Sequence, residues 1–290
     1  MKNTTFRKKA LLSSVAMLLV ALVALGSATF AWFAANPNAE AAGLSLKTTA
    51  STGLVVKTDS FDIWSHNAIL NAAQDSEGNL LKNAEDEYYT SPKAFDLQPV
   101  SQDQTTPANF WTVAAKDSGD EIYDPNATMT SASVGTYKAT GAVYSEKIYF
   151  RLSDGSAATT DNVYLTGVTI TKNANATMEN AIRVAVVNNE NQLLGTYCIS
   201  SAGANGTLTT AAKTAGDFNP ALATAVGKDG VKVVDGADLT ADAADKDNYV
   251  TVYVYLDGQD GDCYSDKVGT VNATQIISGI DLDFKLNAAP

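Results

Sequence analysis

The chain has 290 residues, with 20 Lys and Arg, 32 Asp and Glu, one His and a formal net charge of −12. Because 45% of the residues are hydrophobic, the chain is not a disordered tail; its length and composition allow one large β domain or two small ones. Nucleic-acid binding requires clustered Lys and Arg, and the acidic balance argues against it.

The first residues of the chain have the pattern of an export leader. Arg7, Lys8 and Lys9 precede an apolar run over residues 10–25, and small residues follow at 26–29. This order predicts a hydrophobic signal helix within a signal peptide over residues 1–31. The alternative is an uncleaved anchor, because residues 10–35 carry no charge and about 20 apolar residues cross a bilayer. Membrane contact is expected only through this segment.

The junction Ala28-Thr29-Phe30-Ala31, followed by Trp32 and Phe33, resembles the leaders of the TasA and camelysin family of Gram-positive bacteria. In that family a SipW-type signal peptidase cleaves after the Ala, so the resemblance implies cleavage between Ala31 and Trp32. It also implies a jelly-roll subunit assembled by donor-strand exchange. The freed segment, residues 32–48, is then the expected donor, with Leu44 and Leu46 as its inserting side chains.

The rest of the chain shows strand patterns. Apolar residues alternate or cluster in short runs, and no long segment has helical periodicity. The alternating segments predict one buried and one solvated face per strand. The expected strands cover residues 44–46, 52–57, 110–113, 147–152, 162–171, 181–188, 248–256 and 280–286.

Polar turns such as Asp154-Gly155 and Asp257-Gly258 separate these runs. The pattern predicts an all-β fold, an antiparallel, jelly-roll-like β-sandwich over residues 49–290. Residues 65–130 and 200–247 are expected to be irregular insertions, and loops of that length are unusual in a simple sandwich.

No catalytic constellation is present in the sequence. His66, the only histidine, lies in a polar stretch, and no His-Glu-x-x-His, Gly-x-Ser-x-Gly or P-loop motif occurs. The acidic run Glu85, Asp86 and Glu87 is typical of a solvated turn rather than a glycosidase pair. The chain is therefore not expected to be an enzyme, and the protease activity ascribed to camelysin is not carried over.

Two polar features leave alternatives open. Asp257, Asp260 and Asp262 could hold Ca²⁺ as a weak site, the only cofactor considered, or form an ordinary soluble turn. Cys198 and Cys263 could form one disulfide or remain separate buried thiols.

Tyr249, Tyr253 and Tyr255 alternate along one predicted strand. They form either a sugar-binding platform or a packing surface under another layer, and packing is the commoner role.

The sequence favours a secreted or cell-surface structural protein, a fibre or biofilm-matrix subunit that associates with itself by β-strand addition. The alternative is an adhesin or carbohydrate-binding module.

Overall fold

The computed structural model describes residues 45–50, 53–91, 97, 99–112, 130–133, 142–153, 162–173, 178–199, 222–234, 239, 248–258, 260, 263 and 277–287. The chain divides into two compact units, residues 1–42 and 43–290, and every described residue belongs to the second. The predicted signal helix, the cleavage site at Ala31 and Trp32, Leu44 and Asp262 lie outside the described residues.

The described residues form an all-β fold, as predicted. Their regular structure consists of fourteen strands and one short 3₁₀ helix. The elements are β1 (Ser45–Ala50), β2 (Leu54–Thr58), β3 (Asn67–Ile69), β4 (Pro99–Gln102), β5 (Asn109–Thr112), β6 (Thr130–Ser133), β7 (Val143–Leu152), β8 (Val163–Lys172), η1 (Glu179–Ala181), β9 (Ile182–Asn188), β10 (Leu193–Tyr197), β11 (Leu222–Ala223), β12 (Val231–Val234), β13 (Tyr249–Asp257) and β14 (Ile277–Leu286). The predicted domain boundary after residue 48 therefore falls inside β1.

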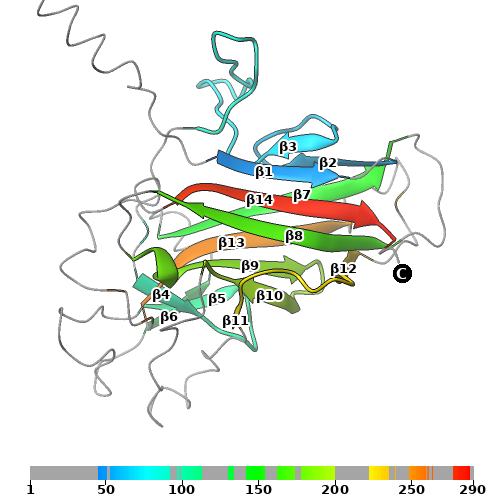
Figure 1. Cartoon of the computed structure of the whole chain (residues 1–290). Helices are drawn as coiled ribbons and strands as arrows, with labels where there is room; N and C mark the ends of the chain where they lie inside the picture. The colour runs from blue at the N-terminus through cyan, green and yellow to red at the C-terminus, as the bar shows by residue number, and fades with distance from the viewer. Residues whose placement is uncertain are drawn as a thin grey trace, which may run out of the picture. The chain divides into compact units, whose positions relative to one another are not determined.

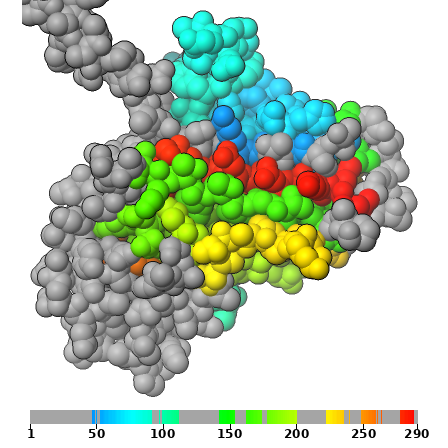
Figure 2. All heavy atoms as spheres, in the orientation of Figure 1, coloured from blue at the N-terminus to red at the C-terminus, as the bar shows by residue number. Residues whose placement is uncertain are grey.

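One sheet has five strands in the order β12-β8-β14-β1-β3. Its centre is the ten-residue β14, which pairs antiparallel with β8 and parallel with β1. Figure 1 shows β14, in red, between the green β8 and the blue β1. The side chains of these strands and of β12 form a continuous visible surface in Figure 2.

The second sheet is built around β13. This strand pairs antiparallel with β9 on one side and with β7 on the other, and β7 pairs in turn with β2. At the end of β13, Leu256 and Asp257 pair with β4, which continues to β5 and β6. On the β9 side of β13, the sheet continues from β9 to β10 and then to β11.

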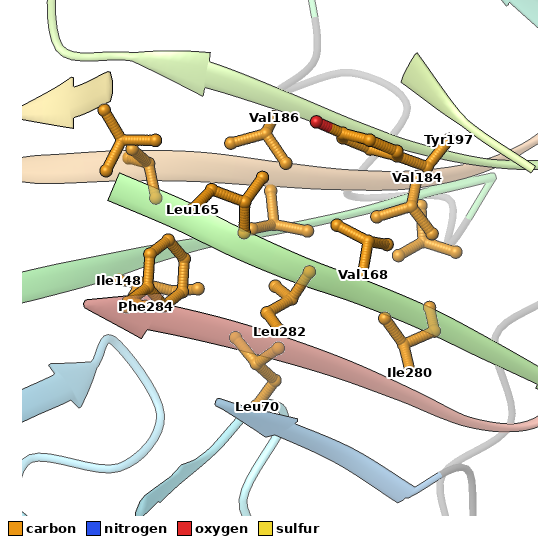
Figure 3. Close-up of a cluster of buried hydrophobic side chains, with 14 of the residues drawn as sticks. Leu70, Ile148, Leu165, Val168, Val184, Val186, Tyr197, Ile280, Leu282 and Phe284 are labelled. Atoms are coloured by element: carbon orange, nitrogen blue, oxygen red, sulfur yellow. The ribbon is translucent and has the colours of Figure 1, made fainter. Parts of the chain in front are cut away.

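The main core lies between the two sheets, because each contributes an alternating apolar face. On β7, Ile148 and Phe150 are fully buried while Tyr149 and Arg151 are half-buried, as the alternation predicts. The ring centroids of Phe150 and Phe284 on β14 are 4.8 Å apart. Figure 3 shows this cluster, with side chains of β7, β8, β9 and β14 pointing toward one another.

The prediction of one solvated face fails for β9 and much of β13. Ala185, Val187, Tyr253 and Tyr255 point away from the main core yet are buried in a second apolar cluster. Phe110 on β5 packs into that cluster. The alternation of the tyrosines allowed packing under a second layer, but β4 and β5, which provide that layer, reach β13 through contacts distant in sequence.

The sheets are also not purely antiparallel. The pairs β1 with β14, β4 with β13 and β10 with β11 are parallel.

Within the predicted insertion over 65–130, residues 72–90 form a ladder of isolated bridges rather than an irregular loop. The bridges join Ala72 with Thr90, Gln74 with Leu80, and Lys82 with Tyr88. Its two turns share one hydrogen-bond pattern. In each turn a side-chain oxygen, Asp75 Oδ1 or Asn83 Oδ1, accepts hydrogen bonds from the backbone N–H groups two and four residues later.

Candidate functional site

The predicted donor segment ends in β1, which lies in a sheet of its own chain. Leu46 pairs with Ile280, Thr48 with Leu282 and Ala50 with Phe284, all in parallel register. On its other side, residues 47–49 of β1 pair with the three-residue β3, and the Ala50 N–H donates to the His66 carbonyl oxygen at 2.8 Å. Strand addition to another copy would therefore first require β1 to leave this position.

The inward side chains described on β1 are small or polar. Thr48 is fully buried and Ala50 nearly so, whereas the facing strand β14 buries Ile280, Leu282 and Phe284. The Thr48 hydroxyl is buried and has no hydrogen-bond partner among the described residues. An unsatisfied buried hydroxyl costs about 1–3 kcal/mol. The described part of β1 thus adds little apolar contact and one unfavourable polar group.

Removal of β1 would leave an acceptor edge. Residues 279–284 of β14 would lose their partners on that side, while β8 would still pair along the other. An uncovered strand edge presents a row of free N–H and C=O groups that another strand can satisfy. The apolar inward face of β14 would set the register of that strand.

The acidic loop after β13 binds a buried arginine. Arg183, from β9, lies with its Nε 3.4 Å from Asp257 Oδ2, and its Nη2 donates to Asp260 Oδ2. Ser101 Oγ donates to Asp257 Oδ1 at 2.9 Å, and the Arg183 Nη1 donates to backbone carbonyls of Asn180 and Ile182. All three charged side chains are excluded from solvent.

This arrangement gives Asp257 and Asp260 a cation from their own chain. The guanidinium forms ion pairs with both carboxylates, which is the role that the calcium prediction assigned to Ca²⁺. Asp262 lies outside the described residues, so the three-carboxylate site stays a prediction. Sequence reasoning missed Arg183, although one charged residue inside the apolar run 181–187 is the pattern that could have indicated a buried ion pair.

Cys198 and Cys263 are both buried and do not form a disulfide with each other in this structure, which is the second of the two alternatives considered. Cys263 is fully buried beside the Arg183 ion pairs. Burial, followed by the nearby Asp257 and Asp260, raises the pKa of its thiol, which makes the thiolate scarce at neutral pH.

The three tyrosines of β13 do not form a shared exposed platform. Tyr253 and Tyr255 are buried, with ring centroids 5.5 and 5.3 Å from that of Phe110. The packing interpretation is therefore confirmed for these two. Tyr249 alone is half-buried, and its ring centroid lies 5.7 Å from that of Tyr149 on β7.

The remaining candidates lie at the surface. His66 is exposed, with its Nδ1 2.9 Å from the Leu54 carbonyl oxygen. Glu85, Asp86 and Glu87 occupy an exposed hairpin turn, where Asp86 pairs with Lys82 at 3.0 Å. These groups are not assembled around a common point.

Within the described ranges, no group of three or more His, Cys, Asp or Glu is placed to hold a metal ion. No helix in that part of the chain is long and apolar enough to cross a membrane. Comparison with family models, curated proteins and solved structures found no match to this chain.

Proposed function

We propose that the chain is a secreted or cell-surface structural protein of a Gram-positive bacterium, a subunit of an extracellular fibre or biofilm matrix. The leader's resemblance to TasA and camelysin leaders supports export and cleavage between Ala31 and Trp32 by a SipW-type peptidase. The proposal involves no enzymatic activity, no nucleic acid, and membrane contact only through the signal segment.

The observation that carries the proposal is the position of β1. It is the first described strand, it runs parallel to the last strand of the fold, and its described inward residues are Thr48 and Ala50. Release of these two residues therefore sacrifices little apolar burial. The β1 of a second copy can replace it on β14 with the same backbone hydrogen bonds.

Such an exchange generates a fibre rather than a closed dimer when it proceeds in one direction. Each copy gives β1 to one neighbour and receives β1 from another, so the contact is heterologous and does not close. The proposal also includes the jelly-roll fold that the resemblance of the leader implies.

The test compares two chains, one beginning at Trp32 and one beginning at residue 51, after β1. The first is expected to form filaments visible by electron microscopy. The second is expected to form none and to bind a synthetic peptide of residues 42–50, because its β14 edge is free.

A peptide with Thr48→Asp is the matched control, since a carboxylate at this fully buried position opposes insertion. Equal filament formation by both chains, or equal binding of both peptides, would exclude exchange of β1.

A further inference from the structure

A row of aromatic and basic side chains crosses the outer face of the second sheet. Strand register places Lys57 of β2 opposite Tyr149 of β7, and Tyr149 opposite Tyr249 of β13. These three residues point away from the main core, because their neighbours along each strand are buried in it. The complete row, which we call the aromatic–cation row, consists of Trp64, Arg151, Lys57, Tyr149, Tyr249 and Lys147.

Each basic side chain of the row lies close to at least one of its aromatic rings. The Lys57 Nζ lies 5.3 Å from the Trp64 ring centroid and 5.5 Å from that of Tyr149. The Arg151 Cζ lies 4.5 Å from the Trp64 centroid, and the Lys147 Nζ lies 4.0 Å from that of Tyr249. All six side chains are half-buried, so each keeps part of its surface in solvent while its orientation is fixed.

The row concentrates positive charge on an acidic protein. Lys57 forms an ion pair with Asp62 at 2.9 Å, and the Tyr149 hydroxyl donates to Asp59 Oδ1 at 2.9 Å. Lys147 and Arg151 form no ion pair with any residue that the structure describes. The Arg151 Nε is buried and has no hydrogen-bond partner among those residues. Because this Nε is shielded from solvent, an anion outside the sheet would be bound by the terminal Nη groups of Arg151, for which no hydrogen bond to a described residue is found.

We propose that the aromatic–cation row binds an acidic polysaccharide whose sugars carry carboxylates. Rings of Trp and Tyr combine an apolar face with a polar edge, which suits the apolar face of a sugar ring. A guanidinium held on Trp64 presents a planar pair of donors to a carboxylate. Strands lie about 4.8 Å apart, so the row spans roughly 10 Å across three strands, a length that suits an oligosaccharide segment better than one sugar.

This binding function goes beyond the fibre proposal and does not depend on it. The row lies on β2, β7 and β13 of the second sheet, whereas β1 and β14 belong to the first. A variant in the row can therefore lose polysaccharide binding while β1 exchange is unchanged, and the reverse also holds.

The experiment is affinity electrophoresis of the full secreted chain through native gels that contain polygalacturonate or neutral dextran. We expect polygalacturonate to retard the protein, dextran to leave its mobility unchanged, and added salt to weaken the retardation because the attraction is between charges. Arg151→Gln and Tyr249→Ala are each expected to raise the apparent Kd at least fivefold.

Lys285→Gln is the matched control, because it removes one exposed charge from β14 in the other sheet and should leave the Kd unchanged. Arg151→Lys keeps the charge without the planar donor pair and should give an intermediate Kd. Circular dichroism confirms that each variant is folded before it is compared.

Three results would overturn the proposal. They are no retardation by polygalacturonate, equal effects of Arg151→Gln and Lys285→Gln, and equal retardation by dextran. A fourth is loss of self-association in Arg151→Gln with polygalacturonate binding intact, which would make the row a contact for a second copy instead.

Discussion

Two buried ionisable side chains, Arg183 and Glu146, connect segments of the fold that lie far apart in sequence. Arg183 links the strand β9 to the loop after β13 through Asp257 and Asp260, all within the protein interior. Glu146 on β7 accepts the backbone N–H groups of Ser60 and Asn71, each at 2.7 Å, and is also contacted by the Tyr144 hydroxyl. Each therefore connects segments that lie far apart in sequence.

Replacing Arg183 with Met should destabilise the protein by about 3–5 kcal/mol, because it leaves two buried carboxylates without their cation. The measurement is urea-induced unfolding followed by circular dichroism. Lys172→Met is the control, since the ion pair of Lys172 with Glu179 is solvent-exposed and should contribute less than about 1 kcal/mol. Equal stability of the two variants would contradict the structural role of Arg183.

Glu146 should make stability depend on pH. Burial raises the pKa of its carboxyl above 4.5, against hydrogen bonds that lower it. A folded-state pKa above the unfolded value means that the folded protein binds the proton more tightly. The stability contributed by this group is therefore complete below pH 4.5 and is lost as pH rises through the folded pKa.

The check is the free energy of unfolding of the wild-type protein relative to Glu146→Gln at several pH values. This difference should shift against the wild type as pH rises above about 4.5. Glu77→Gln, in an exposed turn, provides the control for the change of charge alone. A difference that is constant with pH, or that shifts in favour of the wild type, would contradict the assignment.

At the scale of elements, strands differ in how firmly they are held. β14 pairs along both edges and buries four large apolar side chains, whereas the described inward residues of the adjacent β1 are Thr48 and Ala50. A strand with few buried apolar contacts opens more readily than the sheet around it. The proposed exchange therefore requires β1, rather than β14, to open first.

Thr48→Val should hold β1 in place more firmly. It replaces the buried, unpartnered hydroxyl with a methyl group of similar size and should stabilise the protein by about 1 kcal/mol. If exchange requires β1 to open, filament growth should slow roughly fivefold, as followed by light scattering. Thr169→Val, exposed on β8, is the matched control, and faster or unchanged growth of Thr48→Val filaments would contradict exchange.

Sequence periodicity predicted the strands that have long alternating patterns, such as β7 and β14. It missed β3, β4, β6, β10, β11 and β12, which have two to five residues each and acquire their partners from distant parts of the chain. Parallel pairing of β1 with β14 is likewise invisible locally, because it joins the first and last described strands. The sequence predicted a strand at residues 44–46, where β1 begins. Arg183 and the aromatic–cation row could not be recognised from the sequence, because tertiary contacts bring their members together.

At the scale of the whole molecule, the two sheets carry different candidate functions. The first holds the exchangeable strand β1 against β14, and the second carries the aromatic–cation row. Cleavage after Ala31 would remove four basic residues from the chain of net charge −12 and leave 16 basic against 32 acidic residues, a net charge of −16. Copies of the cleaved chain should therefore repel one another at low ionic strength, and assembly should accelerate as salt screens that repulsion. Polysaccharide binding should weaken as the salt concentration rises. A single salt titration therefore separates assembly from polysaccharide binding.

In a fibre built by strand exchange, β1 of one copy pairs with β14 of another. Lys47 and Asp281 lie opposite each other in that pairing, so we would mix filament-forming chains that carry either Lys47→Cys or Asp281→Cys and oxidise the filaments. The buried Cys198 and Cys263 are replaced by Ser or Ala in both chains. Strand exchange predicts a covalent dimer containing one copy of each variant on a non-reducing gel, because paired positions lie within disulfide range. The account would be contradicted if the mixed filaments gave no such dimer while a chain carrying both substitutions formed the bond within itself.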